Sequence, residues 1–492
     1  MQEPRGEPAV AAPASGSELP LYATAALMTY TSAAGITTVY SMLSLFYREF
    51  NDPLHLGWVV TSYWLVASVC AALCGRLGDV FGRRRMSMTV LTIAGLGALV
   101  SARSHALPGV VLGCALQGAA GTLTPLAIGI LREALPKQKL PLAIGIVSAA
   151  GTTGAGVSFM VAGFFIDHFS WRGGFYMKAT LAALTMFALL ATVRPQAARS
   201  GAFSKSGASG LLFAPAIAGI FVCLQYAKSL GWHNGLVWGG IVACLALLLF
   251  WGFQQSRQPN PLIDVRSLLQ RPVLLANLSI AFLAMGFMQN GQVMSLLFQQ
   301  PAWTGIGFAL SATLAGALLL PLNSISLIGG PTAGNLTRRF GARPVALTGC
   351  SLIIAAASAI ALYHRALPFV IIADLAGLFG LSLVQTSSYI TVVQATAPER
   401  TSEATGMTYV FLNTFIAIGG QIIFLLFATQ TVTNPALGAG TYPSEAGYGF
   451  AFTFLIATAL AGLIVAWLLP QRAAVDSELS ARSPARNLAK ST

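Results

Sequence analysis

The sequence predicts an all-α membrane protein that crosses the bilayer many times. Of its 492 residues, 55% are hydrophobic and only 9% are charged, and the mean hydropathy is +0.71. A soluble globular domain carries roughly a quarter charged residues, so this chain has too few charges to cover a water-facing surface. Apolar stretches that approach or exceed the roughly 20 residues of a spanning helix recur along its length. These observations exclude a soluble enzyme.

Breaks at charged or Pro/Gly-rich clusters divide the apolar sequence into fourteen expected helices. The first, 21–46, is too long for the hydrophobic core of a signal peptide, and the tail before it has three glutamates and one arginine. We therefore expect it to be a span. The others are expected at 56–74, 87–102, 107–131, 142–166, 174–193, 210–229, 236–254, 273–297, 307–330, 344–362, 367–394, 404–428 and 449–469.

The basic residues predict how these helices are oriented. An even number of spans places both tails on one side, and on that assignment the tail side holds 22 lysines and arginines against 5 on the other. The positive-inside rule then puts both termini in the cytoplasm of a cell (inner) membrane protein. Basic loops that face anionic lipid headgroups also account for the net charge of +13, so no nucleic-acid partner is expected.

No chemistry of an enzyme or of a bound cofactor can be read from the sequence. All six cysteines fall inside apolar stretches, where a thiol behaves as a small hydrophobic group, and no residues have metal-ligand spacing. No Gly-rich phosphate-binding loop with a lysine is present, which argues against an ATP-driven pump. We expect no metal, no cofactor and no catalytic residues.

Two loops on the expected inner side each have a similar copy later in the chain, and the two copies are displaced by almost the same number of residues. The run GRLGDVFGRRR at 75–85 is similar to GNLTRRFGAR at 334–343, and a second pair of loops begins at Pro136 and Pro398. The offsets are 259 and 262 residues, which indicates duplicated halves. The predicted organisation is an N-terminal tail (1–20), a six-helix bundle (21–193), a linker with two extra helices (194–272), a second six-helix bundle (273–469) and a C-terminal tail (470–492).

The loop at 75–85 resembles the signature loop of the major facilitator superfamily. The fourteen-span layout, the Trp171-Arg172 pair and the run PLIDVR at 261–266 resemble its drug:proton antiporter branch. The resemblance implies two six-helix bundles with two additional central helices, a small-molecule substrate and alternating access to a site at the midplane. Protons are an expected second partner, and no oligomer is required.

The signature loop is the candidate conformational latch. A carboxylate at the inner tip of the second span can accept bonds from an arginine or a helix N-terminus in one state of the transporter and not in the other. The alternative is a solvated loop whose arginines only set topology. The latch is expected to comprise Gly75, Asp79, Gly82, Arg83 and Arg84.

Three features of the resembled branch are missing here. The first span has no acid at 29–34, Cys114 stands where an arginine is expected, and the fifth-span Gly-Pro element is reduced to glycines. Asp374 is then the only acid placed deep inside a span. Because an unpaired charge there costs several kcal/mol, the carboxyl must be neutral, paired or hydrated. We expect Asp374 to couple proton movement, the alternative being a structural hydrogen bond, and Lys178 is a candidate partner.

Polar side chains inside the spans are the candidates for the substrate cavity. An amide buried in lipid needs a partner, which either a substrate or a neighbouring helix can supply. The cluster at 289–292 is the densest, and the methionines and phenylalanine around it would suit an amphipathic molecule. The candidates are Gln117, Gln289, Asn290, Gln292 and Tyr389.

Together these features predict a secondary active transporter that exports amphipathic organic compounds by proton antiport. Two alternatives remain open on the sequence. One is a facilitator or uptake carrier without the usual proton coupling, which the missing acid and arginine favour. The other is a membrane receptor or scaffold that has kept the fold and lost transport.

Overall fold

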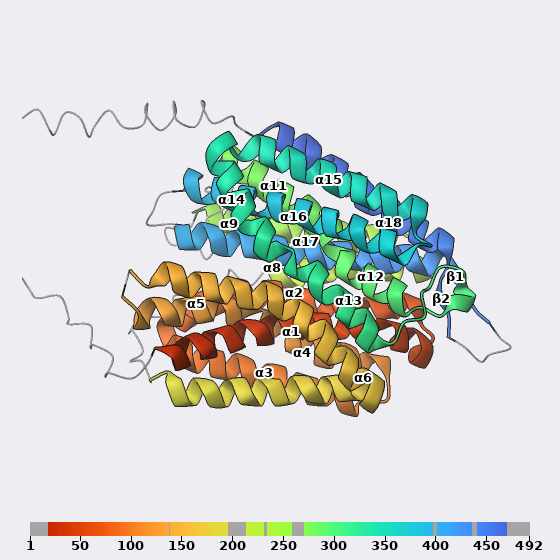
Figure 1. Cartoon of the computed structure of the whole chain (residues 1–492), viewed down its shortest axis with the longest axis horizontal. Helices are drawn as coiled ribbons and strands as arrows, with labels where there is room; N and C mark the ends of the chain where they lie inside the picture. The colour runs from red at the N-terminus through yellow and green to blue at the C-terminus, as the bar shows by residue number, and fades with distance from the viewer. Residues whose placement is uncertain are drawn as a thin grey trace, which may run out of the picture.

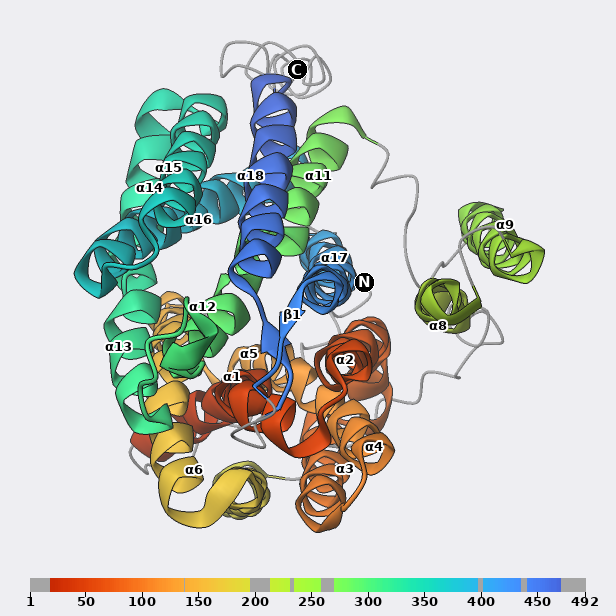
Figure 2. The ribbon, with the colours of Figure 1, turned by 90° about the vertical axis from the view of Figure 1, so that its right-hand side faces the viewer.

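The computed structural model describes residues 18–136, 138–194, 213–230, 234–257, 270–396, 401–434 and 440–469. Within these ranges the chain is helical apart from one two-stranded hairpin, and most helices run along a common direction (Figure 1). Two groups of helices, called here the N-half (α1 to α6) and the C-half (α11 to α18), lie side by side (Figure 2).

The N-half begins with long helices that enter through a proline. A proline in the first helical turn loses no hydrogen bond there, because that N–H has no partner within the helix. Helix α6 is interrupted at Phe169 and Ser170, where the backbone leaves helical geometry and the chain turns back on itself (Figure 1). The elements are α1 (Leu19–Phe50), α2 (Pro53–Phe81), α3 (Arg83–Arg103), α4 (Leu107–Gln117), η1 (Gly118–Thr122), α5 (Leu123–Ala134) and α6 (Leu140–Thr192).

The C-half contains two further interrupted stretches. Helices α11 and α12 are separated by a break at Gly286, and α13 and α14 meet at Ile325. The elements are α11 (Arg271–Met285), η3 (Phe287–Gln289), α12 (Asn290–Gln299), η4 (Ala302–Thr304), α13 (Ala312–Ser324), α14 (Ser326–Phe340), α15 (Ala342–Tyr363), α16 (Leu367–Ala395), α17 (Thr401–Thr429), β1 (Thr431–Val432), β2 (Tyr442–Pro443) and α18 (Glu445–Trp467).

Two helices between the halves in sequence pack on each other to one side of both bundles. These are α8 (Phe213–Leu230) and α9 (Gly235–Arg257) (Figure 2). Their contact is reciprocal: Cys244 of α9 lies against Gly219 of α8, and Cys223 of α8 lies against Gly240 of α9. Small residues allow such close approach of helices in lipid. The remaining surface of α9 is apolar and largely unburied, as a lipid-facing helix requires.

Ten helical stretches in the described ranges are long and apolar enough to cross a membrane. One of them, Gly145–Thr192, has 48 residues and contains the turn at Ser170. At 1.5 Å per residue its two segments together contain roughly 70 Å of helix, about twice what is needed to cross the ~30 Å core of a bilayer once. The protein is therefore an all-α, multi-pass membrane protein, as the composition predicts.

The duplicated loop reappears in the backbone. Gly82 joins α2 to α3 with φ 91°, and Gly341 joins α14 to α15 with φ 89°. These residues are 259 positions apart, which is the offset of the sequence repeat. A positive φ strains residues that carry a Cβ atom and is accessible to glycine, so both loops need glycine at this point.

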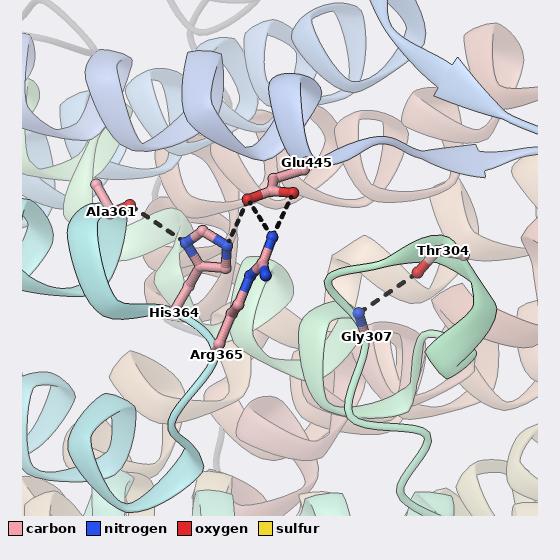
Figure 3. A network of polar contacts seen from close by, with 6 residues as sticks. All are labelled: Thr304, Gly307, Ala361, His364, Arg365 and Glu445. Carbon is pink, nitrogen blue, oxygen red and sulfur yellow. Dashed lines mark hydrogen bonds and ion pairs between the residues drawn. The ribbon is translucent and has the colours of Figure 1, made fainter.

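A polar network lies at the end of the C-half where α16 and α18 begin. Glu445, at the start of α18, accepts from Arg365 Nη2 at 3.3 Å and lies 3.0 Å from His364 Nε2 (Figure 3). His364 and Arg365 belong to the turn between α15 and α16. The network therefore ties the start of α16, the helix that carries Asp374, to α18.

Candidate functional site

Asp374 lies inside the C-half with no exposed surface. It is seven residues into α16, which places it about 11 Å from the start of that helix. Asn290 Nδ2 donates to its Oδ1 at 2.6 Å, and its Oδ2 is buried without a hydrogen-bond partner. The structure thus places the expected coupling carboxyl next to one member of the expected amide cluster.

The amide cluster fills the break between α11 and α12. Gly286 departs from helical geometry with φ −100° and ψ −103°, so nearby carbonyl groups lose their helical partners. Gln289 Nε2 donates to the carbonyl oxygens of Ala284 (2.6 Å) and Ile416 (3.0 Å). Gln292 Nε2 in turn donates to Gln289 Oε1 at 3.1 Å. The cluster therefore stabilises a broken helix and connects it to α17.

Three buried acceptor atoms of this group have no protein partner: Asp374 Oδ2, Asn290 Oδ1 and Gln292 Oε1. Buried polar atoms are nearly always hydrogen-bonded, so such a concentration indicates that another donor is used in some state. The Asn290 amide can donate to a carboxylate through its nitrogen or accept from a carboxylic acid through its oxygen. The Asp374–Asn290 pair can therefore accommodate both protonation states.

An apolar surface between the halves lies next to the cluster. Trp64 of α2 packs with Met288, Phe415 and Tyr389 of the C-half around a buried group that includes Ile416. All four side chains are only partly buried, although they lie well inside their helices. The Trp64 ring is held in place because its Nε1 donates to the Tyr40 hydroxyl at 3.1 Å. A flat, apolar compound could contact both halves here.

Sequence reasoning missed Trp64. Tryptophans in membrane proteins concentrate at the headgroup boundary, and several in this chain fall near expected span ends. Trp64, however, is eleven residues into α2 and faces the other half of the protein. The position of Trp64 in the middle of an expected span, and not at its end, was the sequence feature that could have identified it.

The other two cavity candidates, Gln117 and Tyr389, do not contact Asp374. Gln117 donates to Ser101 Oγ (3.1 Å) and to the Gly113 carbonyl (2.9 Å), within the α3–α4 contact of the N-half. Tyr389 is 22 residues into α16, toward the end of that helix opposite to Asp374, and its ring is 6.0 Å from that of Tyr409. The structure thus joins Gln289, Asn290 and Gln292 to Asp374 and leaves Gln117 in helix packing.

The described side chains of the latch loop contact their own half. Arg83 Nε lies 3.3 Å from Glu133 Oε1 of α5, and Arg84 Nη2 donates to the Leu190 carbonyl of α6 at 3.2 Å. Gly75 and Asp79 lie on α2 before the turn at Gly82, and their contacts are outside the described part of the chain. The role of Asp79 therefore remains a proposal.

Lys178, the other deeply placed charge, does not bind Asp374. Its Nζ donates to the carbonyl oxygen of Gly35 on α1 at 2.5 Å and lies 5.3 Å from the centre of the Phe175 ring. The side chain is only 7% exposed. Among the described residues, the buried lysine of the N-half and the buried aspartate of the C-half therefore each have their own neighbours.

The halves contact each other closely where α13 begins. Asp167 of α6 accepts from the backbone N–H groups of Ala312 (3.1 Å) and Thr313 (2.8 Å), at the start of α13. These are the orphan donors of a helix N-terminus, where a carboxylate is favoured. Ser295 Oγ of α12 also donates to the Tyr40 carbonyl at 2.9 Å. Helix α12 therefore begins at the Asp374 site and continues into the contact between the halves.

Comparison with known proteins identifies the family. The sequence profile described as Major Facilitator Superfamily matches residues 25–420. The chain belongs to this superfamily. It is 28% identical over 382 residues to the multidrug resistance protein Stp of Mycobacterium tuberculosis, a match that covers 76% of this chain and 68% of that protein. It is 24% identical to the MFS efflux transporter aclA of Aspergillus oryzae, covering 86% and 79% of the two chains.

Solved structures agree on the fold. The nucleoside transporter NupG superposes with a TM-score of 0.64 at 16% identity, over 91% of this chain and 99% of that one. A partially occluded, inward-open conformation of the xylose transporter XylE from E. coli gives 0.60 at 14% identity, over 92% and 99%. The major facilitator fold makes this chain a transporter of small molecules, and its relatives include proteins named for multidrug resistance and efflux.

Proposed function

We propose that this major facilitator protein exports amphipathic organic compounds in exchange for protons. The observation that carries the proposal is the fully buried Asp374, with one oxygen bound by Asn290 and the other without a partner. A carboxyl group in such a place costs much less free energy neutral than charged, so it binds and releases a proton only when its surroundings change. The surroundings of Asp374 change when the transporter converts between the two states of alternating access.

The proposed coupling passes through α12. Asn290, which binds Asp374, is the first residue of this helix, and Ser295 in its middle binds the N-half. When Asp374 gains a proton, its hydrogen bond with the Asn290 amide is no longer charge-assisted, so α16 holds α12 less strongly. The outer contact between the halves then changes with the protonation state. Two states that differ in this way are what exchange of a proton for a compound requires.

The compound is proposed to bind against Trp64, Met288 and Phe415. Methionine and aromatic side chains adapt to apolar molecules of different shape, and aromatic faces also attract cations. Gln289 and Gln292 would supply the polar contacts on one side of the same surface. The names of the relatives, multidrug resistance and efflux, support this class of substrate.

We further propose fourteen crossings, both termini in the cytoplasm of the cell membrane, and two six-helix bundles at 21–193 and 273–469. The turn at Phe169 and Ser170 supports two crossings by α6. The lengths of α1 and α2, 32 and 29 residues, support one crossing each. The excess of basic residues on the proposed inner side supports the orientation.

The test uses purified protein in liposomes with an imposed pH gradient. Lipophilic cations such as tetraphenylphosphonium are added, and the lumenal pH is followed together with uptake of the compound. Antiport predicts that each uptake event moves protons in the opposite direction. Uptake with no change of pH would instead favour a facilitator, and no uptake of any compound would favour a receptor or scaffold.

Changing Trp64→Ala is expected to weaken binding of an aromatic cation about tenfold, because losing one aromatic contact face costs about 1–2 kcal/mol. The measurement is the Kd for tetraphenylphosphonium in nanodiscs. Trp238→Ala, on the lipid side of α9, is the matched control and should leave the Kd unchanged. Equal Kd values for the two variants would remove Trp64 from the binding surface.

Changing Asp79→Asn is expected to lower the transport rate severalfold without reducing membrane insertion, because a latch that favours one state loses its charged contact. Transport is measured per molecule of protein at the membrane. Arg85→Gln changes the charge of the same loop at an exposed side chain and serves as the control. A fully active Asp79→Asn variant at normal levels would leave the loop with a topological role only.

A further inference from the structure

Lys178 is a buried ammonium group that the proposed coupling through Asp374 does not use. It lies in the second segment of α6, after the turn at Ser170, and is only 7% exposed. An ammonium group has three N–H donors. The contacts described for Lys178 are one carbonyl, that of Gly35, and one ring face, that of Phe175. Burying a charge with so few partners costs free energy, so we expect this charge to have a function that offsets the cost.

No acid compensates this charge among the described side chains of the N-half. The acids there are at helix ends: Glu18, Glu49, Asp52, Glu133 and Asp167. The titratable group given next to Lys178 is Cys114 from α4, and Cys114 in turn lies near Tyr63 from α2, which has Tyr40 from α1 as a neighbour. The arginines of α3 are at its two ends, and on α6 itself the nearest charge, Arg172, stacks on Trp171.

The surroundings of Lys178 can hold the amine with or without its extra proton. In the charged form the Gly35 carbonyl and the Phe175 ring stabilise the ammonium. A neutral amine still donates to Gly35 and has one lone pair that accepts from a neighbouring donor. A thiol is a weak donor of this kind, and Cys114 of α4 lies near Lys178. Lysine is suited to this role because its protonation state responds readily to burial, whereas arginine stays charged.

Lys178 is also connected to the proposed binding surface. The Tyr63 hydroxyl packs directly against Gly35, the residue whose carbonyl binds Lys178, and donates to the Ser32 carbonyl at 3.3 Å. The next residue, Trp64, lies at the binding surface, and its ring is 5.5 Å from that of Tyr63. A cation that docks on Trp64 therefore approaches a fixed positive charge in the N-half, and removing that charge removes the repulsion.

We propose that Lys178 is a second proton-binding residue of the transport cycle. As a cationic compound binds against Trp64, the ammonium gives one proton to water and becomes a neutral amine, and it regains a proton when the compound leaves. The arriving cation replaces the charge that departs, so the N-half keeps the same net charge. This inference rests on the proposed proton antiport, and it assigns one exchanged proton to each half of the protein.

The test measures the Kd for tetraphenylphosphonium against pH in lipid nanodiscs. When binding displaces protons, log Kd falls by the number displaced for each unit rise in pH, and the size of this slope gives that number. The wild type should therefore show a slope of about two in the pH range where both groups are protonated in the free protein and deprotonated in the complex. Lys178→Arg, which stays charged, and Lys178→Gln, which is always neutral, should each lower the slope to about one. Asp374→Asn should also leave a slope of about one, since Lys178 remains.

The outcomes separate this inference from the proposed function. A wild-type slope of about one that both Lys178 variants retain would show that Lys178 has a structural role, while antiport through Asp374 stands. A wild-type slope of zero would overturn proton antiport itself. If the Lys178 variants do not fold, as thermal unfolding in the nanodisc would show, the comparison of the wild type with Asp374→Asn decides: a residual slope supports Lys178, and its absence overturns it.

Discussion

Changing Asp374→Asn is expected to remove the proton that is exchanged through the C-half, to weaken proton-driven export and to leave the fold intact. Asparagine has nearly the same shape and can still pair with Asn290, so the contact between α16 and α12 survives. It cannot gain or lose a proton, and so the state of α12 no longer follows the pH. We expect accumulation driven by a pH gradient to fall by about 5- to 150-fold, the usual range of a coupling free energy of 1–3 kcal/mol.

The measurement is the liposome assay, with lumenal pH and compound recorded together. Asp52→Asn is the matched control, because it makes the same chemical change at an exposed carboxylate that pairs with His55 at the start of α2. That variant should transport normally. If Asp374→Asn moved protons with each compound as the wild type does, Asp374 would be a structural residue and the coupling group would lie elsewhere.

Changing Gly316→Ala is expected to prevent closure of the outer side. Gly316 of α13 lies so close to the backbone of Phe159 and Met160 on α6 that a methyl group there would meet their main-chain atoms. These atoms belong to the opposite half and cannot move aside as a flexible side chain would. Overpacking of this kind costs about 1–3 kcal/mol, which is enough to shift two states of similar energy by roughly 5- to 150-fold.

The shift can be followed with a cysteine introduced at Ala315, which is 1% exposed beside the same contact. In a background without the native cysteines, a membrane-impermeant maleimide should label it faster from outside in the Gly316→Ala variant, and transport should fall. Gly330→Ala is the control, since a methyl group on that glycine of α14 meets open space. Equal labelling with and without Gly316→Ala would mean that this contact persists in both states.

Some of the candidate site could be reached by elimination. Asp374 is identifiable because so few acids occur and all others fall near expected span ends. The cluster at 289–292 stands out because three amides within four residues of a span are costly unless they bind something. The sequence does not show which partner each of these residues binds. Asp374 binds Asn290, 84 residues away, and Gln289 binds the carbonyl oxygen of Ile416, 127 residues away.

Other residues were misleading when considered alone. Gln117 has the same chemistry as Gln289, yet its amide nitrogen donates within the α3–α4 contact and not at the Asp374 site. Trp64 has the same side chain as the interfacial tryptophans, yet it faces the opposite half. Lys178 and Asp374 are opposite charges in the membrane, yet they bind different partners. In each case residue type indicates that a partner is needed, and the packing of distant helices selects it.

The sequence by itself determined the class of protein, its membrane setting and its duplicated loops. Those depend on composition and on short-range patterns, because the cost of placing charge in lipid and the need for glycine at a positive φ are local effects. Only the tertiary structure decided that α11 and α12 are separated at Gly286, that Asn290 binds Asp374 and that α12 connects this pair to the N-half. Such contacts depend on which faces of distant helices meet, and in lipid that is set by shape and hydrogen bonding and not by hydrophobicity.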